Sequence, residues 1–269
     1  MRFLVVVFAL LLISVQAEEP TTLTWIGGAS GSLLTESNWD PAGLPQNENW
    51  ARITNSVTFT ESGKDYYWRN AKLTIVGKST VNFGARFWFP KSDSYLINKK
   101  DVLVDIEEGS SLNATYMIGG KNTATFIKTG KGSIVGRCIG SSGNLYEKIR
   151  ILDGAVSLYG GEDNCLRAVS SIEIGEDASV KVESKNGIDT STASARVLVQ
   201  VDGILDFNSQ AQKIDGLTGS GIVTNAFGGV KLQMRAQKQN VFSGRFHGRL
   251  EVAPLADAPE DACLIIGDA

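Results

Sequence analysis

The chain has 269 residues, with 29 glycines against 6 prolines, 42% hydrophobic residues and 20% charged residues. This composition excludes a disordered chain and is typical of an ordered, β-rich protein with many turns. The formal net charge of −3 and the absence of a Lys/Arg run argue against nucleic acid as a partner.

The first seventeen residues predict a signal peptide. Arg2 gives a positive start, an apolar run of 13 residues follows from Phe3 to Val15, and Val15-Gln16-Ala17 supplies a small-residue cleavage site. A retained membrane anchor is the alternative, but a spanning helix needs about 20 apolar residues. We therefore expect cleavage near Ala17 and a mature protein without a transmembrane span that is secreted or held at the cell surface.

Residues 18–53 form a separate N-terminal segment that contains Trp25, Trp39 and Trp50. A repeating β-structure needs an atypical unit at its end to cover apolar side chains and unpaired strand edges. We expect 18–53 to be such a leader and cap, with the three tryptophans supplying the cover.

Residues 54–269 favour an all-β, parallel β-solenoid, because helical periodicity is absent and one pattern recurs. Eight segments each contain a strand, a small turn and a second alternating strand, and they begin about 24 residues apart, well short of the roughly 40 of a propeller blade. We expect one right-handed single-stranded parallel β-helix of about eight coils, continuous over 73–252. The segments are 73–83, 102–114, 125–136, 149–159, 172–183, 197–207, 216–225 and 242–252.

Alternation within these segments predicts which side chains face the core. Asp-Gly pairs at 153–154 and 202–203 are also typical of antiparallel hairpins, so a hairpin sandwich is the structural alternative. The fixed period favours the solenoid. The residues predicted to point inward are Ile151, Val156, Ile174, Val199 and Phe207.

Two stretches near the end carry family motifs. Residues 211–225 contain the turn Gly219-Ser220-Gly221, and residues 240–252 contain the step Phe242-Ser243-Gly244. With GGVKLQM between them, they resemble the autotransporter-associated β-strand repeat, although this family usually has small polar residues around the middle strand. The resemblance implies a bacterial right-handed β-helix exported to the cell surface, with a passenger or adhesive role and no active site.

The segment 24–53 is similar to the leader that precedes such repeats in secreted bacterial surface proteins. That leader has a Trp-x-Gly-Gly step, then Asn-Trp, then Gly-x-Pro. The matching positions are Trp25, Gly27, Gly28, Asn38, Trp39, Gly43 and Pro45.

Catalytic chemistry has few candidates, and we predict no catalytic, cofactor-binding or metal-binding residues. His247 is the single histidine, and we interpret it as a solvent-facing turn residue. The run 160–163 lacks the repeated array of calcium-binding solenoids and is interpreted as a solvated turn. The carboxylates available to a lyase or glycosidase form no recognisable signature. They are Asp101, Asp105, Glu107, Glu108, Asp153, Glu162 and Asp163.

The leading functional prediction is a non-catalytic, secreted or cell-surface structural or adhesive module, with surface glycans or other surface proteins as partners. The alternative is a carbohydrate-active β-helix that binds or cleaves glycans, because aromatic rings stack on sugars. Core packing is the favoured interpretation of the aromatic residues concerned. The candidate glycan-stacking residues are Trp68, Phe87, Trp88 and Phe89.

Cys138, Cys165 and Cys263 are too few for a disulfide scaffold. We expect buried free thiols, with a bridge between Cys138 and Cys165, 27 residues apart, as the alternative. Asn113-Ala114-Thr115 fits a glycosylation acceptor, which we interpret as incidental. The apolar strand 264–266 presents an open edge, which predicts end-to-end self-association.

Overall fold

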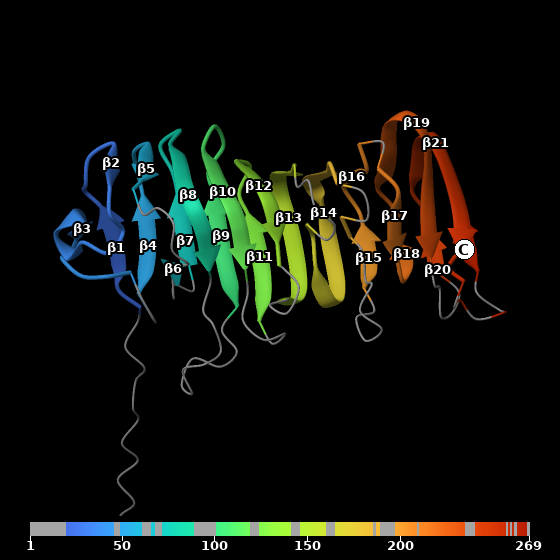
Figure 1. Cartoon of the computed structure of the whole chain (residues 1–269), viewed down its shortest axis with the longest axis horizontal. Helices are drawn as coiled ribbons and strands as arrows, with labels where there is room; N and C mark the ends of the chain where they lie inside the picture. The colour runs from blue at the N-terminus through green and yellow to red at the C-terminus, as the bar shows by residue number, and fades with distance from the viewer. Residues whose placement is uncertain are drawn as a thin grey trace, which may run out of the picture.

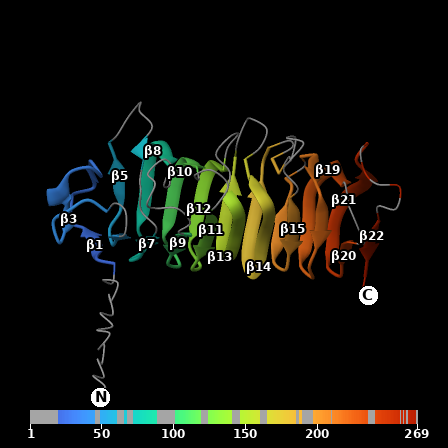
Figure 2. The ribbon, with the colours of Figure 1, turned by 90° about the horizontal axis from the view of Figure 1, so that it is seen from below.

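The computed structural model shows a parallel β-solenoid of about seven turns with about 24 residues per turn. This confirms the predicted fold class and coil length, with about one turn fewer than expected. Figures 1 and 2 show the strands stacked along the long axis, from the blue N-terminal end to the red C-terminal end. The described residues are 20–45, 49–60, 66–67, 72–88, 101–118, 124–140, 146–159, 165–184, 187–188, 197–208, 210–234, 240–256, 258, 260 and 263–267.

Three groups of residues singled out from the sequence lie outside the described part of the chain. They are the expected signal peptide 1–17, the aromatic residues Trp68 and Phe89, and the turn 160–163. Among the described residues, no helix has the length and apolar character needed to cross a bilayer.

Ladder 1, the first of three stacks of strands, runs the length of the solenoid. Each strand pairs in parallel with the strand one coil later, and a bridge between Gly219 and Phe242 joins the last two pairs. The strands are β1 (Thr22–Trp25), β4 (Trp50–Ile53), β7 (Lys72–Ile75), β9 (Val102–Ile106), β11 (Thr125–Thr129), the first halves of β13 (Tyr146–Leu158) and β14 (Ala168–Val182), β15 (Leu198–Val201), β18 (Gly216–Thr218), β20 (Asn240–Phe242) and β22 (Leu264–Ile266).

The next part of each coil forms ladder 2, which is also parallel. Ladder 3 is the third side of the coil. It consists of the C-terminal parts of the longer ladder 2 strands, beyond a shift in register, together with β6 (Tyr66–Tyr67) and β17 (Gln212–Ile214), which pair with two of these parts. The strands of ladder 2 are β2 (Ser30–Gly31), β5 (Val57–Phe59), β8 (Thr80–Trp88), β10 (Ser111–Ile118), β12 (Ser133–Ile139), the second halves of β13 and β14, β16 (Ile204–Asp206), β19 (Ile222–Met234) and β21 (Arg245–Pro254).

The core consists of apolar side chains that lie in register from coil to coil. In ladder 1, five successive register partners are all 0% exposed: Phe126, Ile149, Ile172, Val199 and Leu217. Each such side chain contributes about 1.5–3 kcal/mol when it leaves water. The five residues predicted to point inward are all buried, which confirms the assigned strand phase: Ile151, Val156, Ile174, Val199 and Phe207.

Glycine is required where ladder 1 turns into ladder 2, because successive corners touch through their backbones. A Cβ at Gly203 would lie 2.2 Å from the carbonyl oxygen of Ala178, and a Cβ at Gly221 would lie 2.2 Å from that of Gly203. The Asp-Gly pairs at 153–154 and 202–203 are such corners and not hairpin turns, because the flanking strands pair in parallel with neighbouring coils.

The two motifs near the end of the chain occupy successive corners. The backbone N–H of Ser243 donates to the carbonyl oxygen of Gly219 at 2.9 Å, and that of Arg245 donates to Gly221 at 2.8 Å. Gly219-Ser220-Gly221 therefore stacks directly beneath Phe242-Ser243-Gly244. This is the arrangement that a coil-by-coil repeat requires.

The N-terminal end is closed by β3 (Trp39–Asp40), which follows the 3-10 helix η1 (Glu36–Asn38) and pairs antiparallel with β1. Trp25 and Trp39 are each 1% exposed, and their rings meet edge to face with centroids 5.2 Å apart. Each indole N–H donates to a backbone carbonyl of the same segment. β4 pairs with one edge of β1, and β3 covers Thr24 and Trp25 on the other edge.

Candidate interaction surface

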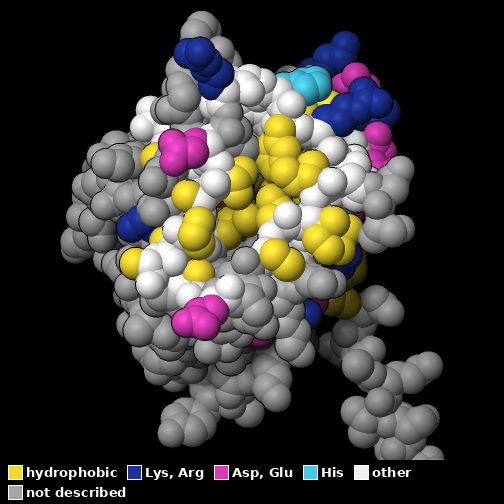
Figure 3. All heavy atoms as spheres, turned by 90° about the vertical axis from the view of Figure 1, so that its right-hand side faces the viewer, with side chains coloured by type: hydrophobic (Ala, Val, Ile, Leu, Met, Phe, Trp, Pro, Cys, Tyr) yellow, Lys and Arg dark blue, Asp and Glu magenta, His cyan; other side chains and the backbone are white. Residues whose placement is uncertain are grey.

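At the C-terminal end of the described residues, the solenoid presents open strand edges. β21 and β22 are the last strands of their ladders, and among the described residues no strand pairs with the outer edge of either. Figure 3 looks onto this end and shows hydrophobic side chains gathered at its centre, with charged side chains around them. We call this surface, formed by β21, β22 and the end of β19, the end face.

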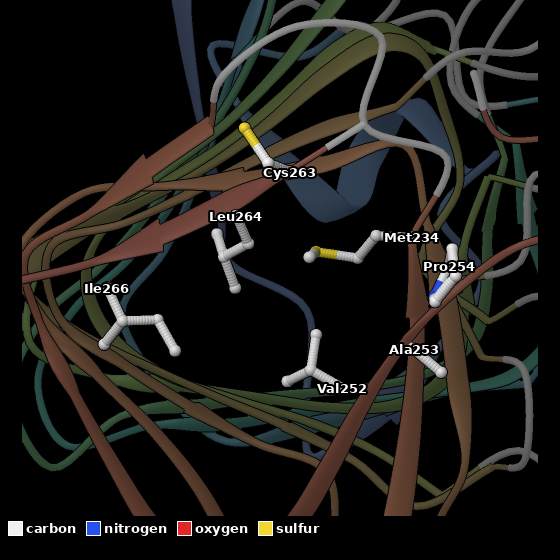
Figure 4. Close-up of a pocket in the computed structure, with 7 residues that line it drawn as sticks. All are labelled: Met234, Val252, Ala253, Pro254, Cys263, Leu264 and Ile266. Carbon is white, nitrogen blue, oxygen red and sulfur yellow. The ribbon is translucent and has the colours of Figure 1, made fainter. Parts of the chain in front are cut away.

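The end face contains an apolar pocket of about 260 Å³. Figure 4 shows residues of β22 along one side of the opening and residues of β21 along another. Ile266 is 58% exposed and Val252 is 37% exposed, although both belong to ladders whose earlier members are buried. The lining residues are Met234, Val252, Ala253, Pro254, Cys263, Leu264 and Ile266.

The two open edges differ in how well they resist pairing with another strand. β21 carries exposed charges at Arg245, Arg249 and Glu251, and it ends at the exposed Pro254, which has no N–H to donate. Charged residues and proline on an edge strand discourage pairing. β22 consists of three apolar residues and has neither.

A buried lysine is a second feature, and the sequence pattern did not lead us to predict it. Lys128 of β11 is 0% exposed, and its register partners in the neighbouring coils are the core residues Val104 and Ile151. Phe126 and Lys128 are two residues apart and point to the same side of the strand. The alternation alone would therefore have predicted that Lys128 is buried.

The ammonium of Lys128 joins two successive corners. Its Nζ donates to the carbonyl oxygens of Gly132 at 2.7 Å and Asp153 at 2.6 Å, and also to that of Gly130. Burial lowers the pKa of Lys128 from 10.5 to about 8, while the nearby carboxylates of Asp153 and Asp105 oppose this shift. The buried ammonium therefore bridges two successive corners through three backbone acceptors and is closed to solvent.

The candidate carboxylates mostly join one coil to the next. Asp101 accepts from the backbone N–H of Thr125 at 3.1 Å. Asp105 accepts from the Thr129 hydroxyl at 2.9 Å. Glu107 accepts from the N–H of Gly77 at 2.6 Å.

The remaining carboxylates differ in their surroundings. Glu108 is exposed, and Asp153 is half-buried beside Lys128. Among the described residues, no three His, Cys, Asp or Glu side chains form a group that could hold a metal ion.

Two of the candidate glycan-stacking residues lie in β8. The backbone register pairs Phe87 with Tyr66 and Trp88 with Tyr67 of the preceding coil. On the other side, Phe87 pairs with the buried Met117. The backbone therefore brings aromatic residues of two neighbouring coils together in ladder 3.

The thiols and the histidine are placed as follows. Cys138 and Cys165 are free and buried, as expected, and burial raises the pKa of the Cys165 thiol. Cys263 is free and exposed, because it lies on the open end face. His247 is solvent-facing as predicted, but it lies within strand β21 and not in a turn. The amide of Asn113 donates to Asn82 of the preceding coil at 2.7 Å.

The comparisons leave the family open. No protein-family model, curated protein or solved structure matches the chain. The end face and the inter-coil contacts therefore carry the functional argument.

Proposed function

We propose that the protein is a non-catalytic structural or adhesive module that acts outside the cell or at its surface. The observation that supports this is how its reactive groups are used. Asp101, Asp105, Glu107 and Lys128 bond to neighbouring coils, whereas the C-terminal end presents an apolar pocket with hydrophobic side chains at its centre. A rod with a regular side and one open end suits spacing and docking, whereas turnover needs free, positioned acid and base groups.

The resemblance of residues 211–252 to the autotransporter-associated repeat supports the same proposal. Its two glycine motifs occupy stacked corners, as a coil repeat requires. Under this proposal, residues 1–17 act as an export signal, and the mature chain contacts surface proteins or surface glycans.

A carbohydrate-active β-helix is the second candidate function. It is favoured by the register that pairs Tyr66 with Phe87 and Tyr67 with Trp88 in neighbouring coils. Aromatic residues at coil spacing would offer successive stacking positions to the rings of a glycan.

One experiment separates these candidates. The purified protein is tested for sugar release from a panel of polysaccharides and for binding on a glycan array, and its location is determined by cell fractionation. The structural proposal expects export and no sugar release. Sugar release that Asp105→Asn or Asp153→Asn abolishes, while the exposed-site control Glu108→Gln leaves it unchanged, would contradict it.

A further inference from the structure

We propose that the end face binds a second copy of the chain, end to end across a two-fold axis, through antiparallel pairing of β22 with β22 of the second copy. This inference rests on the proposed structural function and names the partner of the end face. It follows from the open edges, the closed opposite end and the charges around the pocket.

The pairing edge is β22. Its backbone has a partner, β20, on one side only among the described residues. Its side chains are all apolar, and Ile266 is 58% exposed. An open, uncharged and apolar strand edge is a template for another strand, whereas the charges and Pro254 of β21 discourage pairing there.

The strand of the second copy that pairs with β22 must come from the same, C-terminal end of its solenoid. At the N-terminal end, β3 pairs with Thr24 and Trp25 on the outer edge of β1, so a second copy offers at most the two residues Thr22 and Leu23 as an open ladder 1 edge there. Its own β22 offers all three of its residues. Two like ends form an isologous contact, which closes after two chains and does not grow into a filament.

A two-fold axis through Ile265 gives β22 a self-complementary register. Antiparallel pairing then places Leu264 opposite Ile266 of the second copy, and the reverse, with the two Ile265 residues facing each other. Apolar cross-strand pairs of this kind are favourable. The same contact covers the pocket of each end with the pocket of the other.

The charges around the pocket are complementary under this axis. β21 passes from ladder 2 to ladder 3 between Gly248 and Arg249, where the register with β19 shifts. This corner joins ladders 2 and 3, so it is the corner of the coil that does not adjoin ladder 1, to which β22 belongs. A two-fold axis through Ile265 and this corner exchanges ladders 2 and 3. Arg245, in ladder 2, is then set near Glu251 of the second copy, in ladder 3, and the contact occurs twice.

The test is the molar mass of the purified protein, measured by sedimentation velocity and light scattering across a wide concentration range. We expect a monomer–dimer equilibrium that stops at two. Ile265→Lys should raise the dissociation constant by roughly 100-fold, because the substituted residue meets itself at the axis. Leu198→Lys, at a site 49% exposed on the side of the solenoid, is the matched control and should leave association unchanged.

The charged pair supplies a second test with variants that leave the core intact. Arg245→Glu and Glu251→Arg should each weaken the dimer by roughly 10-fold, and the double variant should restore it. A parent that stays monomeric, a parent that forms filaments, or a dimer unaffected by Ile265→Lys would overturn the inference. A monomeric parent that releases no sugar overturns this inference alone, whereas sugar release overturns the proposed function.

Discussion

The N-terminal and C-terminal ends of the solenoid interrupt the same ladders but differ in how well they cover the side chains that face the core. At the first, Trp25 and Trp39 are each 1% exposed beneath β3. At the second, Val252 is 37% and Ile266 58% exposed. Closing an end therefore takes a strand that reverses direction and large rings behind it, and no such unit follows β21 among the described residues.

This difference shows that a coil of this protein is stable through its neighbours. Residues with the same strand phase are buried in the middle and exposed at the open end, because each coil covers the one before it. The predictions below test that dependence, beginning with the largest expected effect.

Replacing Ile151 with Asp places an unpaired charge in the middle of the ladder, where the parent side chain is 0% exposed. We expect the free energy of unfolding to fall by about 4–5 kcal/mol or more, measured by urea denaturation. The matched change Ile266→Asp, at the open end, should cost the monomer less than about 1 kcal/mol when the two proteins are compared at concentrations below the dissociation constant of the dimer. Equal losses at the two sites would contradict the comparison.

Replacing Trp39 with Ala removes the ring that closes the N-terminal end. The expected loss is about 3–5 kcal/mol, because a large buried side chain is deleted and its cavity remains. Val252→Ala at the open end should cost under about 1 kcal/mol, because water already reaches that side chain. Thermal unfolding of both variants beside the parent measures the contrast.

Replacing Gly221 with Ala tests how tightly a corner near the open end is packed against its neighbour. The added Cβ would lie 2.2 Å from the carbonyl oxygen of Gly203, so the corner must shift, at a cost of about 3 kcal/mol. Gly28→Ala is the control, since the nearest atom to its Cβ lies at 4.0 Å. Similar midpoints for the two variants in urea would show that coils near the open end are loose.

Lys128 predicts an unusual dependence of stability on pH. The folded chain releases the Lys128 proton near pH 8, whereas the unfolded chain keeps it up to about 10.5, so between these values the unfolded state binds more protons. Raising the pH from 8 to 10.5 should therefore favour the folded state, by about 2 kcal/mol relative to Lys128→Met. The two proteins are compared by urea denaturation at each pH. If raising the pH over this range destabilised the parent relative to Lys128→Met, the lowered pKa of Lys128 would be contradicted.

Strand alternation predicted most of the core because it is a local signal. It assigned Ile151 and Val199 correctly, and the same rule applied to Phe126 would have placed Lys128 inside. Ladder 3 was not predicted, since strands as short as β6 and β17 have too few residues to show a period. A two- or three-residue strand becomes visible only when neighbouring coils align it.

The end face was predicted in part. The apolar run 264–266 pointed to an open edge, but Met234 and Val252 come from the preceding coils and belong to the pocket only because coils stack. The exposure of Cys263 has the same origin. A sequence pattern states which side of a strand is apolar, whereas coverage depends on whether another coil follows.

The antiparallel strand β3 also sets a direction for the motions of the molecule. A linear stack of coils frays from its ends, and an end held by an extra strand and two packed indoles opens less readily than an end held on one side. Loosening should therefore start at β22 and advance coil by coil towards β1, with each released coil leaving a fresh open end behind it. Backbone amides would exchange with deuterium in the same order, fastest at β22 and slowest in the coils next to the N-terminal end.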